Sequence, residues 1–332
     1  MSRAISPVRG AVAGLVGNTP LTRLSAISAE LTHTLWAKCE FMNPLGSVKD
    51  RIANFMIEEA VRDGQLRPGG TIVEATGGNT GVALAAVGAT RGHRVVLTMS
   101  DKIGPDKVAL LHAWGAEVVI CDHRAAAGSD HHFVSMARTI AAETPDSYLV
   151  GQFDNPRNVE AHRRTTGPEI YAALDGHVGA FVAGVGTGGT LMGAGGYLRQ
   201  RDPAVRVVLA DPAGSILAGA VTGEPVEPHS YLVEGIGSDF LPGLFEPSLI
   251  TDAVTVTDHE SFFMCLRLQR EEGLFVGGSA GCAVAAARKF AETLDGPPTN
   301  IVAVLPETGT RAMATLYSAS WRAQHGLTDL GE

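Results

Sequence analysis

Apolar, β-branched runs alternate with amphipathic stretches in the first half of the chain. The runs 71–74, 94–99 and 117–121 have the length and composition of strands. The stretches 80–90 and 107–114 between them have the periodicity of helices. A repeated strand–helix–strand order is typical of a parallel sheet, so the pattern predicts an α/β fold.

A second series of the same kind follows in the second half. Strands are predicted at 179–185, 205–210 and 301–305, and a helix is predicted at 189–200. The sequence therefore predicts two mostly parallel sheets rather than one.

The segment between the two series is rich in polar and turn residues. It covers residues 147–158 and places a boundary near residue 150. Residues 212–228 are predicted to form a surface loop, and the chain has no internal repeat. A length of 332 residues is sufficient for two lobes with a large core.

Composition narrows the class of protein. The 40 glycines follow no tripeptide repeat, which favours an enzyme with glycine-rich turns. A net charge of −9 without a lysine or arginine cluster argues against a nucleic-acid partner. The four cysteines are widely spaced, which fits neither a zinc site nor a disulfide scaffold and indicates a reducing cytoplasm.

The first residues superficially resemble a secretion signal. Arg3 and Arg9 precede a short apolar stretch, residues 11–16, which is too brief for a signal peptide. No segment approaches the length of a membrane span, so we expect a cytoplasmic protein without a membrane partner.

Two predicted strands end in glycine-rich turns that lead directly into helices. The first turn lies in residues 74–81 and the second in residues 184–190. Such turns direct backbone N–H groups and the helix dipole at one point, where an anion can bind without arginine. Both turns are therefore candidate anion sites.

The second turn also matches the G-x-G-x-x-G pattern of dinucleotide-binding proteins. Gly184 and Gly189 are its first and last glycines, and Asp211 follows at the distance of a ribose-binding acid. This pattern leaves open an NAD-dependent dehydrogenase, and it leaves open a turn that serves only strand-to-helix packing.

The segment N-P-L-G-S-V-K-D-R places Lys49 at the start of an amphipathic helix over residues 51–61. The positive end of the helix dipole disfavours the ammonium form, which lowers the pKa and favours a nucleophilic amine. From its position alone, Lys49 could equally be a solvated lysine.

This lysine segment resembles that of fold-type II pyridoxal-phosphate (PLP) enzymes, specifically the cysteine synthase and cystathionine β-synthase family. Further segments match the family in the same order: residues 17–21, 76–81, 186–190, 234–237, 272–274 and 277–281. The resemblance covers residues 17 to about 325, nearly the whole chain.

The resemblance implies a two-lobed, three-layer αβα fold. Residues 1–40 and 152–332 would form the larger lobe, which holds the cofactor phosphate. Residues 41–151 would form a smaller, mobile lobe that holds the substrate carboxylate. The larger lobe would also form a homodimer interface.

The resemblance also implies a role for each site residue. Lys49 would bind the PLP aldehyde as an imine and move the substrate Cα proton. Asn79 would bind the ring hydroxyl, and Thr308 would offer its hydroxyl to the pyridine nitrogen, unless it only caps the last strand. The phosphate would be held by Gly186, Thr187, Gly188, Gly189 and Thr190. The substrate would be held by Thr76, Gly77, Gly78, Asn79, Thr80, Gln152 and Gly235.

The implied reaction is β-replacement on serine or an O-activated serine through an α-aminoacrylate intermediate. A hydroxyl at the pyridine nitrogen favours loss of the β-substituent over transamination. A thiol or sulfide would then add, giving cysteine or cystathionine; another nucleophile, in specialised metabolism, stays an alternative.

Some features depart from the family pattern. Gly77 stands where the family usually has serine, and Ser238 stands where a tyrosine is common. A catalytically idle binding protein is therefore a third reading. We expect no haem and no appended regulatory domain. We also expect no metal, because the neighbouring His131 and His132 face apart and have no evident third ligand.

Overall fold

The computed structural model describes residues 12–126 and 128–330, and Arg3 and Arg9, which resembled the start of a secretion signal, lie outside these ranges. The described chain divides into two compact units. The first contains Asn43–Leu45, Lys49–Gly151 and the described residues up to Gly17. The second contains Asn18–Met42, Gly46–Val48 and the described residues from Gln152 onward.

The first unit is built on a parallel sheet. Its described strands are β3 (Thr71–Ala75), β4 (Arg94–Ser100), β5 (Glu117–Cys121) and β6 (Ser147–Leu149). They lie in the order β5-β4-β3-β6, and each neighbouring pair is parallel. The runs that predicted β3 and β4 form the buried centre of this sheet, as expected for strands covered on both faces, whereas the predicted β5 lies at the edge and is partly exposed.

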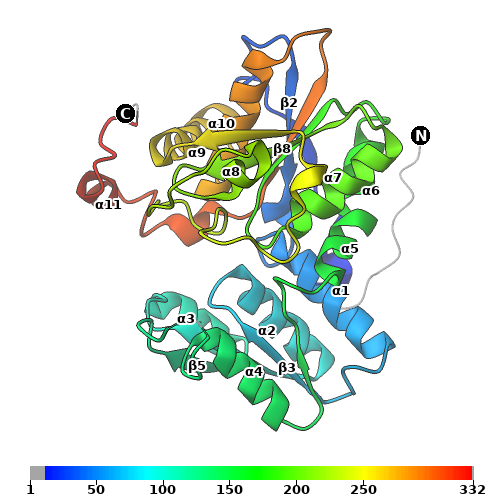
Figure 1. Ribbon diagram of the computed structural model, residues 1–332, viewed down its shortest axis with the longest axis vertical. Coiled ribbons are helices and arrows are strands. Elements are labelled where there is room, and N and C mark those ends of the chain that lie inside the picture. Colours follow the sequence, from blue (N-terminus) through cyan, green and yellow to red (C-terminus); the bar gives the residue numbers. More distant parts are fainter. Residues whose placement is uncertain (1–11, 127, 331–332) are drawn as a thin grey trace. The chain divides into compact units, whose positions relative to one another are not determined.

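Helices cover both faces of this sheet (Figure 1). They are α2 (Asn79–Arg91), α3 (Pro105–Ala113) and α4 (Phe133–Glu143), and α1 (Lys49–Arg62) packs against α2. Leu97 of β4 lies against Gly81 of α2. The next residue, Thr98, donates a hydrogen bond to the Phe133 carbonyl at the start of α4. Because successive side chains of a strand point to opposite faces, α2 and α4 lie on opposite sides, which gives three layers.

The second unit contains the larger sheet. Its described strands are β1 (Leu21–Arg23), β2 (Thr34–Cys39), β7 (Ala180–Gly184), β8 (Arg206–Pro212), β9 (Asp252–Val256) and β10 (Asn300–Leu305). The order is β1-β2-β10-β7-β8-β9. The pair β1 and β2 is antiparallel, and the other pairs are parallel.

Two hydrophobic clusters fill the two faces of this sheet. Ile301 and Ala303 of β10 point into the cluster that contains α9 (Asp258–Glu272) and α10 (Gly278–Thr293). Val302 and Val304 point into the cluster that contains α6 (Thr166–Ala173) and α7 (Gly189–Arg201). The remaining described helices of this unit are α5 (Arg157–Arg164), α8 (Leu217–Thr222) and α11 (Ala319–Gln324). The short 3-10 helices of the described chain are η1 (Val12–Leu15), η2 (Glu40–Met42), η3 (Pro247–Leu249) and η4 (Gly309–Ala312).

The predicted α/β fold with two mostly parallel sheets is confirmed. Each strand and helix named from the sequence is present, with ends within two residues of the prediction. The prediction of a loop over 212–228 is wrong in part, because α8 lies inside it. The buried Asp211 carboxylate accepts a hydrogen bond from the Ala218 backbone N–H, 2.8 Å away, and this contact stabilises a six-residue helix.

Asp211 is a buried acid with an elevated pKa. The side chain is 0 % exposed, and its Oδ1 has no hydrogen-bond partner within the described chain. Burial raises the pKa to about 6, although hydrogen bonds from Ala218 and Ser215 act in the opposite direction. The stability contributed by the protonated acid is complete below pH 3.8 and is lost as the pH rises through about 6.

Asp211→Asn should therefore show a pH-dependent advantage. Asparagine is neutral at every pH, so its stability relative to Asp211 should rise by about 1 kcal/mol between about pH 5 and about pH 7.5. Urea unfolding of both proteins at the two pH values measures this difference. An unchanged difference would show that Asp211 does not titrate in this range.

The segment 17–21, one of those that resemble the family, has a structural role. Asn18 has a positive φ of 50°, and its N–H donates to Glu169 Oε1, 2.9 Å away. The ammonium of Lys38, a residue 1 % exposed, donates to the Thr19 carbonyl at 2.8 Å and to Glu169 Oε2 at 2.6 Å. Thr19 also donates through its hydroxyl to Glu40, 2.7 Å away. This buried charged network attaches the segment to β2 and α6.

Candidate active site

The turn between β7 and α7 contains residues 186–190. Gly188 caps α7 in the left-handed conformation, with φ of 94°. The first N–H groups of a helix have no partner inside the helix, and the 13-residue α7 directs its positive end at this turn. The structure confirms that this turn opens a helix, a geometry that can bind an anion, and anion binding itself stays a prediction.

A second glycine turn lies against the first. A Cβ atom on Gly186 would lie 2.4 Å from the Gly235 carbonyl oxygen, so the two backbones are in contact. The Gly237 N–H donates to the Val185 carbonyl at 2.8 Å and fixes this arrangement. Gly235 has a φ of 83°, and no other atom of the described chain lies within 4 Å of the position that its Cβ would take. The space beside the exposed Gly235 is therefore open.

Helix α5 holds the two threonine hydroxyls of the first turn. Asn158 Nδ2 lies 2.9 Å from Thr187 Oγ1 and 2.8 Å from the Gln152 carbonyl oxygen. One helical turn later, His162 Nε2 lies 3.2 Å from Thr190 Oγ1. The candidate residues Gln152 and Thr187 are thus joined through one buried amide. Asn158 and His162 were not recognised from the sequence.

The other candidate anion site lies in the first unit, between β3 and α2. Its residues are Thr76, Gly77, Gly78, Asn79 and Thr80. The Thr76 N–H donates to the Thr98 carbonyl at 2.9 Å, which ties the turn to β4. Gly78 caps α2 without a side-chain hydrogen bond, so the start of the helix is left to backbone groups. The structure confirms that this turn opens a helix.

Gly77 owes its lack of a side chain to a neighbour that the sequence did not indicate. A Cβ atom at position 77 would lie 2.6 Å from Cγ1 and 2.7 Å from Cδ1 of Ile103. Ile103 follows β4 and is half-buried. The space that a serine side chain would need is thus taken by an apolar side chain.

Gly77→Ser alone should therefore displace Ile103 and weaken substrate binding, by about 10-fold in kcat/KM if the clash costs about 1.4 kcal/mol. Gly77→Ser/Ile103→Ala should recover much of this loss, because the shorter side chain frees the space. Steady-state kinetics of both variants and of Ile103→Ala measure the coupling. Equal losses in the single and double serine variants would exclude a steric origin.

Lys49 is the first residue of α1, as predicted. The preceding residue, Val48, donates its N–H to the Pro306 carbonyl at 2.8 Å, and Ser47 forms a β-bridge with Glu307. The backbone leading into Lys49 is therefore fixed by the segment that follows β10. Ile52, Met56 and Ala60 are fully buried on the predicted apolar face of α1, and Phe55 is half-buried.

Thr308 lies in that same segment. Its N–H donates to the Gly46 carbonyl at 3.1 Å, and its Oγ1 accepts from the Thr310 N–H at 3.3 Å. Thr308 caps the start of η4, the 3-10 helix after β10, whereas the simpler interpretation from the sequence had it cap the strand. The hydroxyl also lies within reach of the Thr310 hydroxyl, at 3.2 Å.

The structure thus brings the predicted site residues together in two groups. Gln152, Gly235 and residues 186–190 are joined within the second unit by the contacts above. Residues 76–80 share one turn in the first unit, where α2 packs against the helix that Lys49 opens.

Asp211 does not act as a ribose-binding acid. Its carboxyl group is fully buried and accepts from the Ala218 N–H, so it cannot reach a bound dinucleotide. The hypothesis of an NAD-dependent dehydrogenase therefore lacks the ribose-binding acid that the G-x-G-x-x-G pattern requires.

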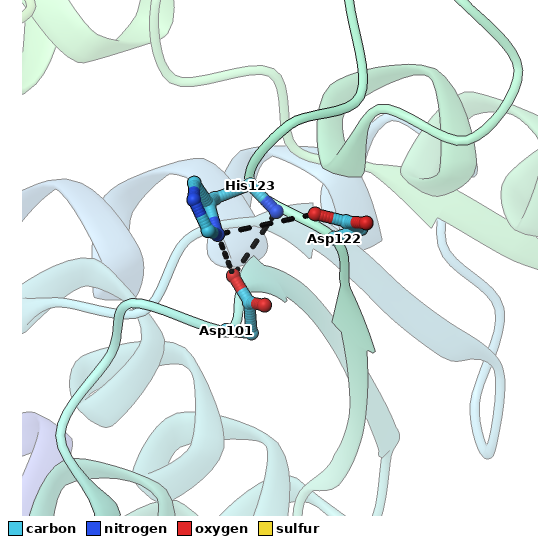
Figure 2. A group of neighbouring side chains, drawn as sticks. All are labelled: Asp101, Asp122 and His123. Atoms are coloured by element: carbon cyan, nitrogen blue, oxygen red, sulfur yellow. Dashed lines mark hydrogen bonds and ion pairs between the residues drawn. The ribbon is translucent and has the colours of Figure 1, made fainter.

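One group of exposed side chains has the spacing of metal ligands (Figure 2). Ligand atoms of Asp101, Asp122 and His123 lie within 4.8 Å of one another. Asp101 accepts from the His123 ring and backbone at 2.8 and 3.0 Å, and Arg124 pairs with Asp122 at 2.8 Å. Hydrogen bonds from His123 lower the pKa of Asp101, and those from Arg124 lower the pKa of Asp122. The protein's own groups thus satisfy these acids. His132, one of the two neighbouring histidines considered as ligands from the sequence, caps the start of α4, where its side chain accepts from the Val134 N–H.

No helix within residues 12–126 or 128–330 combines the length and the apolar character that a membrane span requires.

Comparison with known proteins identifies the family of this chain. The family model described as "Pyridoxal-phosphate dependent enzyme" matches residues 12–307. Cystathionine beta-synthase of Oryctolagus cuniculus is 40% identical over 316 residues, which are 95% of this chain and 57% of that protein. The chain therefore spans just over half the length of this relative.

Two further proteins match over most of their own length. Cysteine synthase A of Escherichia coli is 39% identical over 308 residues, 92% of this chain and 94% of that protein. The crystal structure of O-ureido-L-serine synthase has a TM-score of 0.85 and 38% identity, covering 94% of this chain and 96% of that one. The chain belongs to the family of pyridoxal-phosphate dependent enzymes, and PLP is its cofactor.

Proposed function

We propose that this chain catalyses β-replacement on serine or an O-activated serine, with a thiol or sulfide as nucleophile, to make cysteine or cystathionine. The observation that carries this proposal is the backbone contact between Gly186 and Gly235. This contact supports the proposal because it joins the start of α7 to a second glycine turn, and the space beside Gly235 is open. A phosphate-bearing cofactor and an amino acid are a matching pair of occupants.

The residues of the first turn fit the cofactor phosphate. Backbone N–H groups at the start of α7 are combined with the hydroxyls of Thr187 and Thr190, and the turn itself contains no charged residue. Gly186 and Gly189 have no room for a side chain, so both positions require glycine. When bound, PLP supplies an aldehyde for amino groups and a ring that withdraws electrons from the substrate Cα.

The protein's residues then have distinct roles. Lys49 binds the cofactor covalently through Nζ and moves the proton at the substrate Cα. Asn79 holds the ring hydroxyl, and Thr308 offers a neutral hydroxyl to the ring nitrogen. The substrate carboxylate is bound by Gln152 and by the turn of residues 76–80.

We also propose that residues 41–151 form the mobile, smaller lobe, with residues 1–40 and 152–332 as the larger one. The compact units differ from this division, because the described residues up to Gly17 group with the first unit and Gly46–Val48 group with the second. The compactness of Lys49–Gly151 as a unit with its own sheet supports this division. Closure on the substrate carboxylate excludes water from the reacting atoms.

A screen of donors and nucleophiles tests the function. Serine, O-acetylserine and O-phosphoserine are each added to the PLP-loaded protein, and the visible spectrum is followed. Sulfide, homocysteine or thiosulfate is then added, and the product is identified by mass spectrometry. Cysteine or cystathionine from one donor supports the proposal. No spectral change with any donor would favour an idle binding protein.

A related reaction with another nucleophile is the second candidate. The likeness to O-ureido-L-serine synthase favours it. So does the packing of Ile103 over Gly77, which takes the space of the serine that the family usually has there. The same screen, extended to hydroxyurea and small amines, distinguishes the two reactions.

The assembly and location belong to this proposal. We propose a cytoplasmic homodimer whose interface comes from the larger lobe. The four cysteines are all buried and free, which supports a reducing compartment. Light scattering coupled to size-exclusion chromatography gives the mass, and a monomeric mass at micromolar concentration contradicts the dimer.

A further inference from the structure

Asn158 is the second residue of α5 and is 1 % exposed. Its Nδ2 has two oxygen neighbours, the Gln152 carbonyl at 2.8 Å and Thr187 Oγ1 at 2.9 Å. The side chain therefore connects a candidate substrate residue with the candidate phosphate turn.

The chemistry of these neighbours fixes the orientation of the amide. A backbone carbonyl can only accept, so the nitrogen of Asn158 must face Gln152. That nitrogen also faces Thr187, so the Thr187 hydroxyl accepts from it. The hydroxyl proton of Thr187 is consequently left for a different acceptor.

The oxygen of the Asn158 amide lowers the stability of the fold. Asn158 Oδ1 is buried and has no hydrogen-bond partner among the described residues. A Cβ atom on Gly189 would lie 1.8 Å from it, so the amide is packed directly against the start of α7. A buried carbonyl without a partner costs about 1–3 kcal/mol, and leucine would avoid this cost. The amide is therefore explained by its nitrogen rather than by its oxygen.

We propose that Asn158 is a positioning residue for the cofactor phosphate. By donating to Thr187 Oγ1, it obliges the Thr187 hydroxyl to donate outward, to the phosphate. The inference rests on the proposed binding of phosphate by residues 186–190, and it goes further by assigning the polarity of one hydrogen bond to a residue outside that turn.

The test compares the affinity of the apoprotein for PLP and for pyridoxal, which lacks the phosphate. Asn158→Asp places an acceptor opposite Thr187 and draws the hydroxyl proton inward. We expect PLP to bind about 10-fold or more weakly, while pyridoxal binding changes little. The ³¹P resonance of bound PLP should shift as well. Asn158→Ala, which only frees the hydroxyl, should show a smaller loss of the same kind.

Two further variants complete the design. Asn300→Ala removes an amide that donates to the His177 carbonyl and accepts from Trp36 at the start of β10; it should leave the ratio of the two affinities unchanged. In a Thr187→Val background, Asn158→Asp should no longer alter that ratio.

The outcomes distinguish the positioning role of Asn158 from phosphate binding by residues 186–190. If Asn158→Asp and Asn158→Ala keep the wild-type ratio and ³¹P shift, the positioning role is wrong. An equal loss of PLP and pyridoxal affinity would likewise overturn it, since that result indicates a purely structural role. If Asn158→Asp does not fold, Asn158→Ala decides alone. Wild-type protein that binds PLP no better than pyridoxal would instead refute phosphate binding by the turn.

Discussion

Lys49→Ala should abolish the visible absorbance of the PLP-loaded protein and lower the rate of β-replacement by about 10²–10⁴-fold or more. The variant loses both the covalent attachment and the group that moves the Cα proton. Its backbone should be retained, because alanine is a good helix former at the start of α1 and because Ser47 and Val48 keep their contacts. Absorbance spectra and steady-state rates measure the two effects.

A matched lysine provides the control for this prediction. Lys289 lies on the exposed side of α10, where it contacts the Thr255 carbonyl and Glu260. Lys289→Ala should keep the absorbance and the rate. Borohydride reduction followed by mass spectrometry should place the pyridoxyl group on Lys49, and its appearance on another lysine would refute the assignment.

Lys38→Met should lower the free energy of unfolding by about 3 kcal/mol or more. The ammonium of Lys38 is buried, and its removal leaves Glu169 Oε2 and the Thr19 carbonyl without their donor. The loss should appear as a lower urea midpoint at an unchanged slope, followed by tryptophan fluorescence.

An exposed ion pair serves as the comparison. Arg67 and Asp146 lie 2.9 Å apart, with side chains 73 % and 51 % exposed. Arg67→Met should change stability by less than about 1 kcal/mol, because solvent screens such pairs. Lys38→Met/Glu169→Gln should be more stable than Lys38→Met alone, since it removes the largely buried carboxylate charge that Lys38 compensated. A Lys38→Met protein as stable as Arg67→Met would show that the buried network contributes nothing.

The fold was predictable where a strand is buried on both faces of its sheet. The runs at β4 and β7 are apolar because helices cover them on both sides, and that composition is visible in the sequence alone. The antiparallel β1 was not predictable, since three residues carry no periodicity. Helix α8 was missed for a related reason: its start depends on the buried Asp211, which is seven residues away from Ala218.

In the candidate site, too, residues in contiguous motifs were predictable and residues that act through distant partners were not. Glycine turns and Lys49 stand in contiguous segments, so a resemblance could identify them. Asn158 and Ile103 act through residues 26 or more positions away, and nothing in their local sequence distinguishes them from other packed side chains. Such partners are visible only once the chain is folded.

The two kinds of crowding at the glycines have an evolutionary consequence. At Gly186 the obstacle is the Gly235 backbone, which cannot be removed by any substitution, whereas at Gly77 it is the flexible end of Ile103. Natural variation is therefore free to exchange positions 77 and 103 as a pair while the turn at 186 stays fixed. Changes in the turn before α2 and in the loop after β4 can then accumulate without altering the backbone of the turn at 186.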